Sequence, residues 1–300
     1  MRRRAKIEQK PRAARWQTRA NAPKPRVVVV GFGRLGAALA LRLKAAGWPV
    51  SVLPRSSESV RRAAKLGLKL ADHEDLSAAA LCVLAVPDSA VAAAAASMAD
   101  DLGEETALVH CAGALDLDAF GASAAMLKRL RGSFHPLVAI SDARDPIADH
   151  SVAVAASDRA LMPVLWRMAL ALRMRPIEVP EGRRAAYHAG AVMTAGLMVS
   201  LLDAAVAALG EAGVERTAAL NALLPLAGSA LEGVNKRGLE KGLTGPIARG
   251  DLQVVRAHLE ALPPPLANLY KLLSARALTL VGDTLPLETR NALQRLLGER

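Results

Sequence analysis

The sequence predicts an α/β domain, doubly wound around a mostly parallel sheet, followed by an all-α domain. Strand and helix patterns alternate from residue 26 to residue 181, and the first strand is a run of four valines, Val27–Val30. Such an apolar run is typical of a parallel strand that helices cover on both faces. After Arg183 only helix patterns follow, so we expect two domains, residues 26–181 and 182–300.

The composition limits the classes of protein to which the chain can belong. Hydrophobic residues make up 52% of the 300 residues and aromatic residues 3%, which predicts a core of Ala, Leu and Val. The net charge of +11 is concentrated near the N-terminus, where residues 1–26 hold ten basic side chains and one acid, Glu8. We expect residues 1–25 to form a disordered basic tail and the nearly neutral remainder to bind no specific nucleic acid.

Neither a metal site nor a membrane span is predicted. Cys82 and Cys111 are the only cysteines, and neither lies in a metal-ligand spacing. The apolar run Ala189–Leu202 is shorter than a membrane span, and no secretory signal precedes the first strand. We therefore expect a cytoplasmic protein without a membrane partner.

The first domain begins with a strand, a glycine-rich turn, a helix and a second strand. Gly31–Gly36 follows the valine strand, and Leu35, Leu39 and Leu43 recur with helical spacing before the strand Val50–Leu53. The remaining elements of this domain are helices at 60–66, 91–98 and 158–172, and strands at 68–70, 81–86, 107–110, 133–135, 151–155 and 175–179.

The second domain is expected to contain helices alone. A single long helix spans 184–209, and a helix over 216–233 should kink or break at Pro225. Asp251 stands at the N-cap position of a helix that runs to residue 262, where Pro263–Pro265 ends it. Two more helices, 266–280 and 287–297, complete the chain.

The turn Gly31-Phe32-Gly33-Arg34-Leu35-Gly36 has the pattern of a dinucleotide-binding loop. It follows a strand and opens a helix, which is the context that gives the pattern meaning. Gly31 permits the tight turn, Gly33 lets the backbone approach a pyrophosphate, and Gly36 allows close packing of helix and strand. We therefore predict a Rossmann domain.

The end of the second strand favours NADP over NAD. NAD sites usually place an acidic residue there, whereas this chain has Arg55, Ser56 and Ser57. A guanidinium and two hydroxyls can bind a 2′-phosphate, and Arg34 lies in the nearby loop.

Later strand ends supply further candidates, since ligands bind at the carboxyl ends of parallel strands. Val86, Pro87 and Asp88 follow one strand, and Ala112 and Gly113 follow another; we assign all five to the cofactor site. His110 and His135 also lie at strand ends, and a histidine is the acid or base that suits neutral pH. Either can equally be a structural histidine, and Cys111 is expected to be a small buried residue.

The helical part contains two further candidates. His188 follows Tyr187 on the long helix, whose small residues can contact a second helix or a ligand; plain helix packing explains them equally well. Arg249 lies in the segment 243–251, where it can bind an anionic group or pair on the surface.

These motifs resemble those of Rossmann-like proteins with a C-terminal "domain of unknown function 2520". The resemblance covers residues 26–280 and is most specific at Thr244-Gly245-Pro246-Ile247-Ala248-Arg249-Gly250-Asp251. Such proteins are similar to pyrroline-5-carboxylate reductase, to coenzyme-F420-dependent NADP oxidoreductases and to the 6-phosphogluconate dehydrogenase-like group. The resemblance implies an NADP-binding domain and a helical domain that dimerises and helps to close the site.

The resemblance also bears on two single residues. His135-Pro136 is similar to a His-Pro pair of prephenate dehydrogenases whose histidine contacts the reacting hydroxyl, which favours His135 as the acid or base. Gly196 stands where related chains often have Asn, so a polar substrate contact expected there is in doubt.

We therefore expect an NADP-dependent oxidoreductase, a homodimer through its helical domain, that acts on a small anionic metabolite. Its catalytic candidates are His135, His188 and Arg249. Two alternatives stay open: a non-catalytic NADP-binding regulatory protein, and a nucleic-acid-binding protein that works through the tail.

Overall fold

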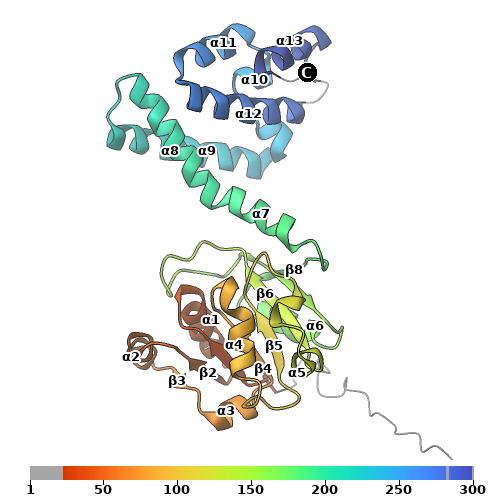
Figure 1. The fold of residues 1–300 in the computed structure, drawn as a ribbon. Coiled ribbons are helices and arrows are strands. Elements are labelled where there is room, and N and C mark those ends of the chain that lie inside the picture. The colour runs from red at the N-terminus through yellow and green to blue at the C-terminus, as the bar shows by residue number, and fades with distance from the viewer. Residues whose placement is uncertain (1–22, 282–283, 299–300) are drawn as a thin grey trace, which may run out of the picture. The chain divides into compact units, whose positions relative to one another are not determined.

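The computed structural model describes residues 23–281 and 284–298, so the predicted tail lies, up to residue 22, outside them. The chain divides into two compact units, Met1–Val192 and Met193–Arg300 (Figure 1). The division falls after Val192 rather than near residue 181, because the first residues of the long helix contact the α/β part. We describe each unit by itself.

The first unit contains an eight-stranded sheet in the order β3-β2-β1-β4-β5-β6-β7-β8. Neighbouring strands are parallel, except that β6 and β7 are antiparallel. The strands are β1 (Val27–Val30), β2 (Val50–Leu53), β3 (Lys69–Leu70), β4 (Leu81–Leu84), β5 (Ala107–His110), β6 (Arg131–Pro136), β7 (Ser151–Ala156) and β8 (Arg175–Glu178). The predicted Rossmann-type sheet is confirmed.

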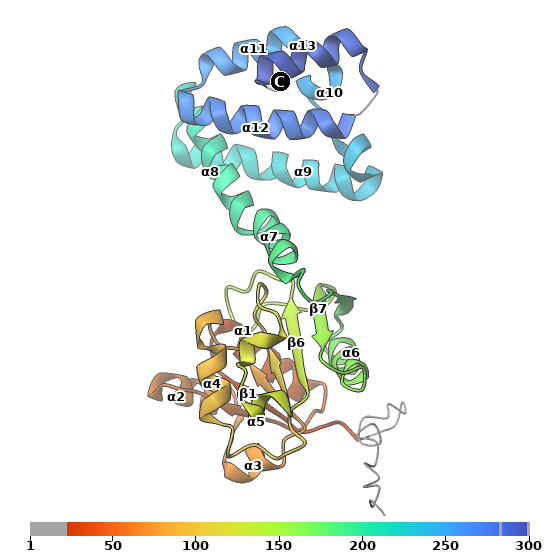
Figure 2. The same cartoon turned by 45° about the vertical axis from the view of Figure 1, so that its right-hand side comes forward.

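Helices cover both faces of the sheet (Figure 2). Val27 and Val29 of β1 belong to one core cluster, whereas Val28 and Val30 belong to another, and all four are buried. This division explains why the strand needs apolar residues at every position. The helices are α1 (Arg34–Ala45), α2 (Ser57–Lys65), α3 (His73–Ser77), α4 (Val91–Ser97), α5 (Ala124–Leu127) and α6 (Met162–Ala171), with short 3₁₀ helices η2 (Asp88–Ala90) and η3 (Leu117–Phe120).

The helices of the second half correct two predictions. The expected single helix 184–209 is two helices, α7 (Arg184–Thr194) and α8 (Gly196–Glu211), which meet at Ala195 with φ −103° and ψ −81°. Next, α9 (Arg216–Gly242) continues through Pro225 and is interrupted instead at Gly238, whose φ is 78°. A long helix can tolerate the hydrogen bond lost at a proline, whereas a positive φ breaks the helical path.

The remaining helices are α10 (Pro246–Arg249), α11 (Leu252–Ala261), α12 (Pro264–Val281) and α13 (Leu287–Leu297). They enclose a small core that includes Ile247, Val255, Leu278 and Leu293. Pro264 begins α12, which agrees with the preference of proline for the first turn of a helix.

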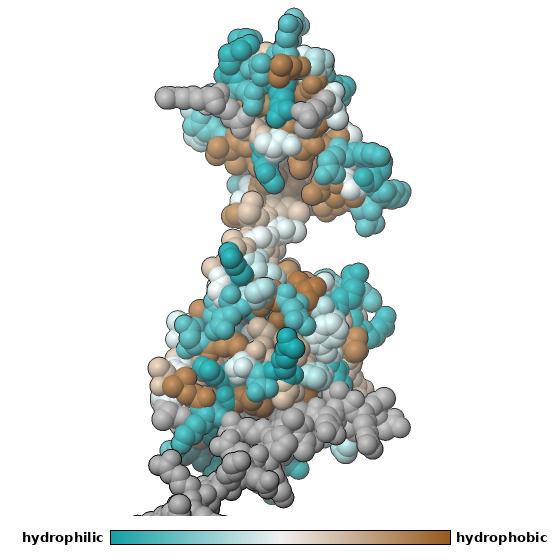
Figure 3. All heavy atoms as spheres, turned by 90° about the vertical axis from the view of Figure 1, so that its right-hand side faces the viewer, coloured by the Kyte–Doolittle hydropathy of each residue, from teal (hydrophilic) through white to brown (hydrophobic). Residues whose placement is uncertain are grey.

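Apolar surface is exposed on the helical unit (Figure 3). Residues Arg184–Glu211 form a helical stretch of 28 residues. Its most apolar window of 18 residues has a mean hydropathy of 2.0, and 6% of that window is buried. By length and composition alone this stretch could cross a membrane. It extends beyond the predicted apolar run, Ala189–Leu202, at both ends.

Candidate functional site

The glycine turn after β1 is built for close contacts on two sides. Gly31 has a φ of +89°, and a Cβ there would lie 2.5 Å from the carbonyl oxygen of Ala85. A Cβ on Gly36 would overlap the carbonyl oxygen of Gly31. Gly33 differs, because no atom lies within 4 Å of the position its Cβ would take. The turn is therefore packed at its two ends and open in its middle.

The start of α1 offers free backbone donors beside Gly33. Gly33 is the N-cap residue, no side chain caps the helix, and the first turn contains no acidic residue. Unpaired N–H groups and the partial positive charge of the helix end favour an anion at this point. The open position at Gly33 and these donors fit the pyrophosphate of a dinucleotide.

A crevice of about 460 Å³ lies at the carboxyl ends of the strands, beside this turn. It lies beside the ends of the neighbouring strands β1 and β4, where the strand order reverses and such folds bind their ligands. Its lining residues are Gly33, Arg34, Leu35, Ala85, Val86, Asp88, Cys111, Gly113, His135, Pro136, Val138, Ile140 and His188. The crevice is thus lined by six of the fourteen predicted cofactor residues and by two of the three catalytic candidates, His135 and His188.

The predicted 2′-phosphate segment follows β2, next to the glycine turn. The backbone N–H of Gly31 donates to the carbonyl oxygen of Leu53 at 3.0 Å, which ties the two segments together. Arg55 is exposed, and Ser56 caps α2 by accepting a hydrogen bond from the backbone N–H of Ser59 at 3.2 Å. The hydroxyl of Ser56 therefore has a structural task that the sequence analysis did not assign to it.

The sequence analysis missed Arg62, which also lies at this end of the site. Its guanidinium donates to the carbonyl oxygen of Phe32 and lies 5.3 Å from the centroid of the Phe32 ring. An arginine on the glycine turn adds positive charge where a dinucleotide would lie. Its position on α2 gave no motif by which it could have been found.

His135 lies at the end of β6, half-buried in the crevice. Its Nδ1 is 2.7 Å from the hydroxyl of Tyr187, and the two rings are perpendicular. Burial, together with the nearby charges of His188 and Arg184, lowers the pKa of His135 to about 4. His135 is therefore neutral at physiological pH.

His188 reaches His135 across Gly113. The two imidazole rings are 5.6 Å apart and nearly perpendicular. A Cβ on Gly113 would lie 2.9 Å from Nε2 of His135 and 2.9 Å from Nε2 of His188. The missing side chain of Gly113 therefore provides the space in which both histidines converge.

Arg184, at the start of α7, is fully buried beneath this cluster. It donates to the hydroxyl of Ser133 at 2.7 Å and to the carbonyl oxygen of Ala112 at 3.1 Å, and its guanidinium carbon is 5.7 Å from the centroid of the Tyr187 ring. Among the described residues no carboxylate pairs with it. Sequence analysis missed this residue, although Arg184, Tyr187 and His188 share one helix face through their spacing.

Two other candidates lie elsewhere. His110 is fully buried against Phe120, with 5.2 Å between ring centroids, and in the described part of the chain neither of its ring nitrogens has a hydrogen-bond partner of normal geometry. Arg249 belongs to the helical unit, where it donates to the carboxylate of Asp251 at 2.9 Å. That bond explains why Asp251 occupies an N-cap position without capping α11 through its side chain.

Cys111 is not a nucleophile in this structure. The residue is buried, and burial raises the pKa of its thiol to about 12. Only a thiolate reacts readily, so the thiol is inert at neutral pH. The expectation of a small buried residue is confirmed.

Comparisons with known proteins agree with this geometry. Residues 150–277 match the model of the domain of unknown function 2520, and residues 23–117 match the NADPH-binding domain of acetohydroxy acid isomeroreductase. No curated protein matches the chain.

Several solved structures are similar to most of the chain. A Bacteroides fragilis protein named as an NADP oxidoreductase is 25% identical, with a TM-score of 0.67 over 85% of this chain and 98% of that one. A Thermotoga maritima protein is 24% identical, with a TM-score of 0.67 over 86% of this chain and 99% of that one. Pyrroline carboxylate reductase of Plasmodium falciparum, solved with NADP, is 12% identical, with a TM-score of 0.54 over 85% and 98%. The chain therefore has an NADP(H)-binding oxidoreductase fold, in which a Rossmann domain precedes a helical region that is similar to the domain of unknown function 2520.

Proposed function

We propose that the protein is a cytoplasmic NADP-dependent oxidoreductase that transfers hydride to or from a small anionic metabolite, with His135 as the acid or base. The observation that supports this most directly is the position of His135, which lines the same crevice as Gly33 and Arg34 of the cofactor turn. The bound cofactor supplies the hydride chemistry, and a proton must move at the substrate in the same reaction. Arg34 and the buried charge of Arg184 favour an anionic substrate.

The experiment that tests this proposal replaces His135 by Asn. Asparagine keeps a hydrogen-bonding group but cannot exchange protons, so turnover should fall by roughly 10²–10⁴-fold while NADPH affinity and fold stay intact. Normal turnover with bound cofactor would refute the assignment, and His188 would replace His135 as the candidate. Arg249 as an anion-binding residue stays a prediction.

Arg55 should decide the choice between the two nicotinamide cofactors. We expect NADPH to bind at least about tenfold more tightly than NADH, a difference of about 1.4 kcal/mol. Arg55→Ala should remove most of that difference, and Arg61→Ala, on the exposed surface of α2, is the matched control. Equal affinities in a fluorescence titration of the unmodified protein would contradict the assignment.

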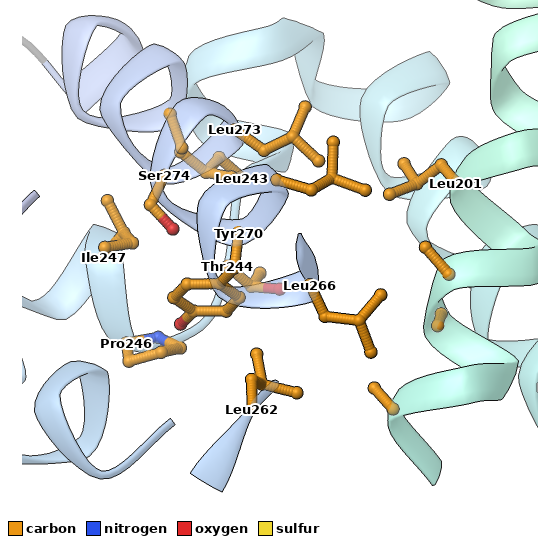
Figure 4. Close-up of a pocket in the computed structure, with 15 residues that line it drawn as sticks. Leu201, Leu243, Thr244, Pro246, Ile247, Leu262, Leu266, Tyr270, Leu273 and Ser274 are labelled. Atoms are coloured by element: carbon orange, nitrogen blue, oxygen red, sulfur yellow. The ribbon is translucent and has the colours of Figure 1, made fainter. Parts of the chain in front are cut away.

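We further propose that the helical part forms a homodimer. Exposed leucines line α8 and α9, and a cavity of about 400 Å³ opens between α8 and the helices that follow it, with Leu201 and Leu266 pointing into it (Figure 4). A second copy is a better cover than a lipid bilayer, since Asp203 of α8 pairs with Arg216 at 2.7 Å and α9 contains further charges.

A non-catalytic NADP-binding regulator is the alternative. It predicts tight cofactor binding without turnover, and Gly196 in place of a polar residue agrees with it. The histidine cluster at Gly113 favours the enzyme instead, since a binding protein has no need of two converging imidazoles.

A further inference from the structure

We propose that Tyr187 and Arg184 form a proton relay behind His135, which makes the crevice a proton-donating site for a substrate with a hydrogen-bond acceptor at its reacting double bond. The relay rests on the proposed function, because it gives direction to the proton that His135 exchanges. Tyr187 is a positioning residue that acts through His135, and Arg184 is its counter-ion.

The hydrogen bond between Tyr187 and His135 links the proton of the phenol to the tautomer of the imidazole. Burial raises the pKa of Tyr187 to about 12, so the phenol keeps its proton at neutral pH. Its hydroxyl is 2.7 Å from Nδ1 of His135 and can donate to it. A neutral imidazole that accepts at Nδ1 has its proton on Nε2, and Nε2 is the nitrogen that faces the space at Gly113. The crevice therefore receives an N–H donor.

A neutral histidine needs such a relay in order to act as an acid. If Nε2 released its proton alone, an imidazolate would remain, which is unfavourable near neutral pH. A second proton that reaches Nδ1 from Tyr187 at the same time keeps the ring neutral throughout. The distance of 2.7 Å is short enough for that transfer.

Arg184 stabilises the product of this transfer. A buried charge without a partner is costly, and no described carboxylate pairs with Arg184. The guanidinium carbon lies 5.7 Å from the Tyr187 ring, so a tyrosinate formed there would be held beside a fixed positive charge.

The proton and electron balance is complete. As hydride adds to the substrate carbon, the π bond of a carbonyl or imine breaks and its electron pair moves to the acceptor atom. That atom takes the proton from Nε2 of His135, Nδ1 takes the proton from Tyr187, and the tyrosinate takes one from water, to which Tyr187 is partly exposed. The site thus matches reduction of the substrate.

The first test is spectroscopic and needs no substrate. Long-range ¹H–¹⁵N correlation spectra of the cofactor-free protein should show His135 protonated on Nε2, and Tyr187→Phe should give a mixture of tautomers. The matched control is Tyr270→Phe, because Tyr270 makes a similar bond to His258, 2.9 Å long, in the helical unit. An unchanged tautomer of His135 in Tyr187→Phe would overturn the relay whether or not the protein is an enzyme.

The second test uses NADPH oxidation with a panel of small keto acids and cyclic imines. Tyr187→Phe should lower turnover by roughly 10–100-fold without weakening NADPH binding, and should have no further effect in a His135→Asn background. Additive losses in the double variant would contradict the relay. A His135→Asn variant with full turnover would instead refute the proposed function, so the two failures are distinguishable.

Arg184→Lys should retain more turnover than Arg184→Gln, because lysine keeps the positive charge. Equal losses of turnover in two folded variants would exclude the counter-ion role.

Discussion

The two units of the chain differ in how fully they bury their apolar residues. In the first unit every residue of β1, β4 and β5 is buried. In the second, α8 buries only Val206, and α9 buries only Ala219 and Gly233. The α/β unit therefore completes its interior within one chain, whereas the helices leave apolar surface exposed, which is the surface on which the proposed dimer would form.

The largest expected effect comes from charging that surface. Leu220, Leu224 and Leu231 lie on one face of α9 and are 40–54% exposed. Leu224→Glu combined with Leu231→Glu should convert the proposed dimer to a monomer, because carboxylates buried in the interface would have no partner there. Light scattering or sedimentation measures the change in mass.

The matched control lies in the other unit. Leu170 of α6 is 63% exposed, and Leu170→Glu should leave the mass unchanged. If the wild-type protein is a monomer, or if the dimer persists in the double glutamate variant, the exposed face of α9 is not a dimer interface.

The second prediction compares two glycines within the α/β unit. Gly36→Ala places a methyl group against the carbonyl oxygen of Gly31, and overpacking of this kind costs about 1–3 kcal/mol of unfolding free energy. Gly33→Ala meets open space, so stability should not change while NADPH affinity falls by about tenfold or more. Urea unfolding and a fluorescence titration measure the two effects separately. Equal losses of stability would show that Gly33 is packed rather than open.

The third prediction concerns the acid stability of the α/β unit. Burial and, to a smaller extent, the charge of Arg184 lower the pKa of His110 from an ordinary value of 6.5 to about 4. The unfolded chain therefore binds more protons between about pH 6.5 and pH 4, and the unfolding free energy should fall as the pH is lowered through that range.

His110→Leu isolates this contribution. The variant should lose about 3 kcal/mol less unfolding free energy than the wild type between pH 7 and pH 4. His258→Leu, in the helical unit, is the control. If the wild type and His110→Leu lose stability equally, His110 is not buried as a neutral group.

The sequence was sufficient where function depends on neighbouring residues. The valine strand, the glycine turn and the lack of an acid after β2 are local features, and each led to the correct domain and cofactor. The relay was not accessible in this way, because His135 and Tyr187 are 52 positions apart and Arg184 and Ser133 are 51 apart. Finding those contacts requires knowing where β6 ends and where the chain enters α7. For the same reason the unit boundary was placed too early.

The antiparallel pairing of β6 and β7 has a consequence for how the protein could change its substrate. Because the chain turns back directly, residues 137–150 need no crossover helix and stay at the ligand end of the sheet, where Val138 and Ile140 face the crevice. Asp145 organises this loop by accepting hydrogen bonds from the backbone N–H groups of Ser141 and Asp142, at 2.7 and 2.8 Å. The loop is also joined to α1, because Arg42 donates a hydrogen bond to the carbonyl oxygen of Arg144. Substitutions at Val138 and Ile140, which line the crevice, can reshape its wall without changing the strands, whereas Ile147 of the same loop is fully buried in the core and must stay apolar.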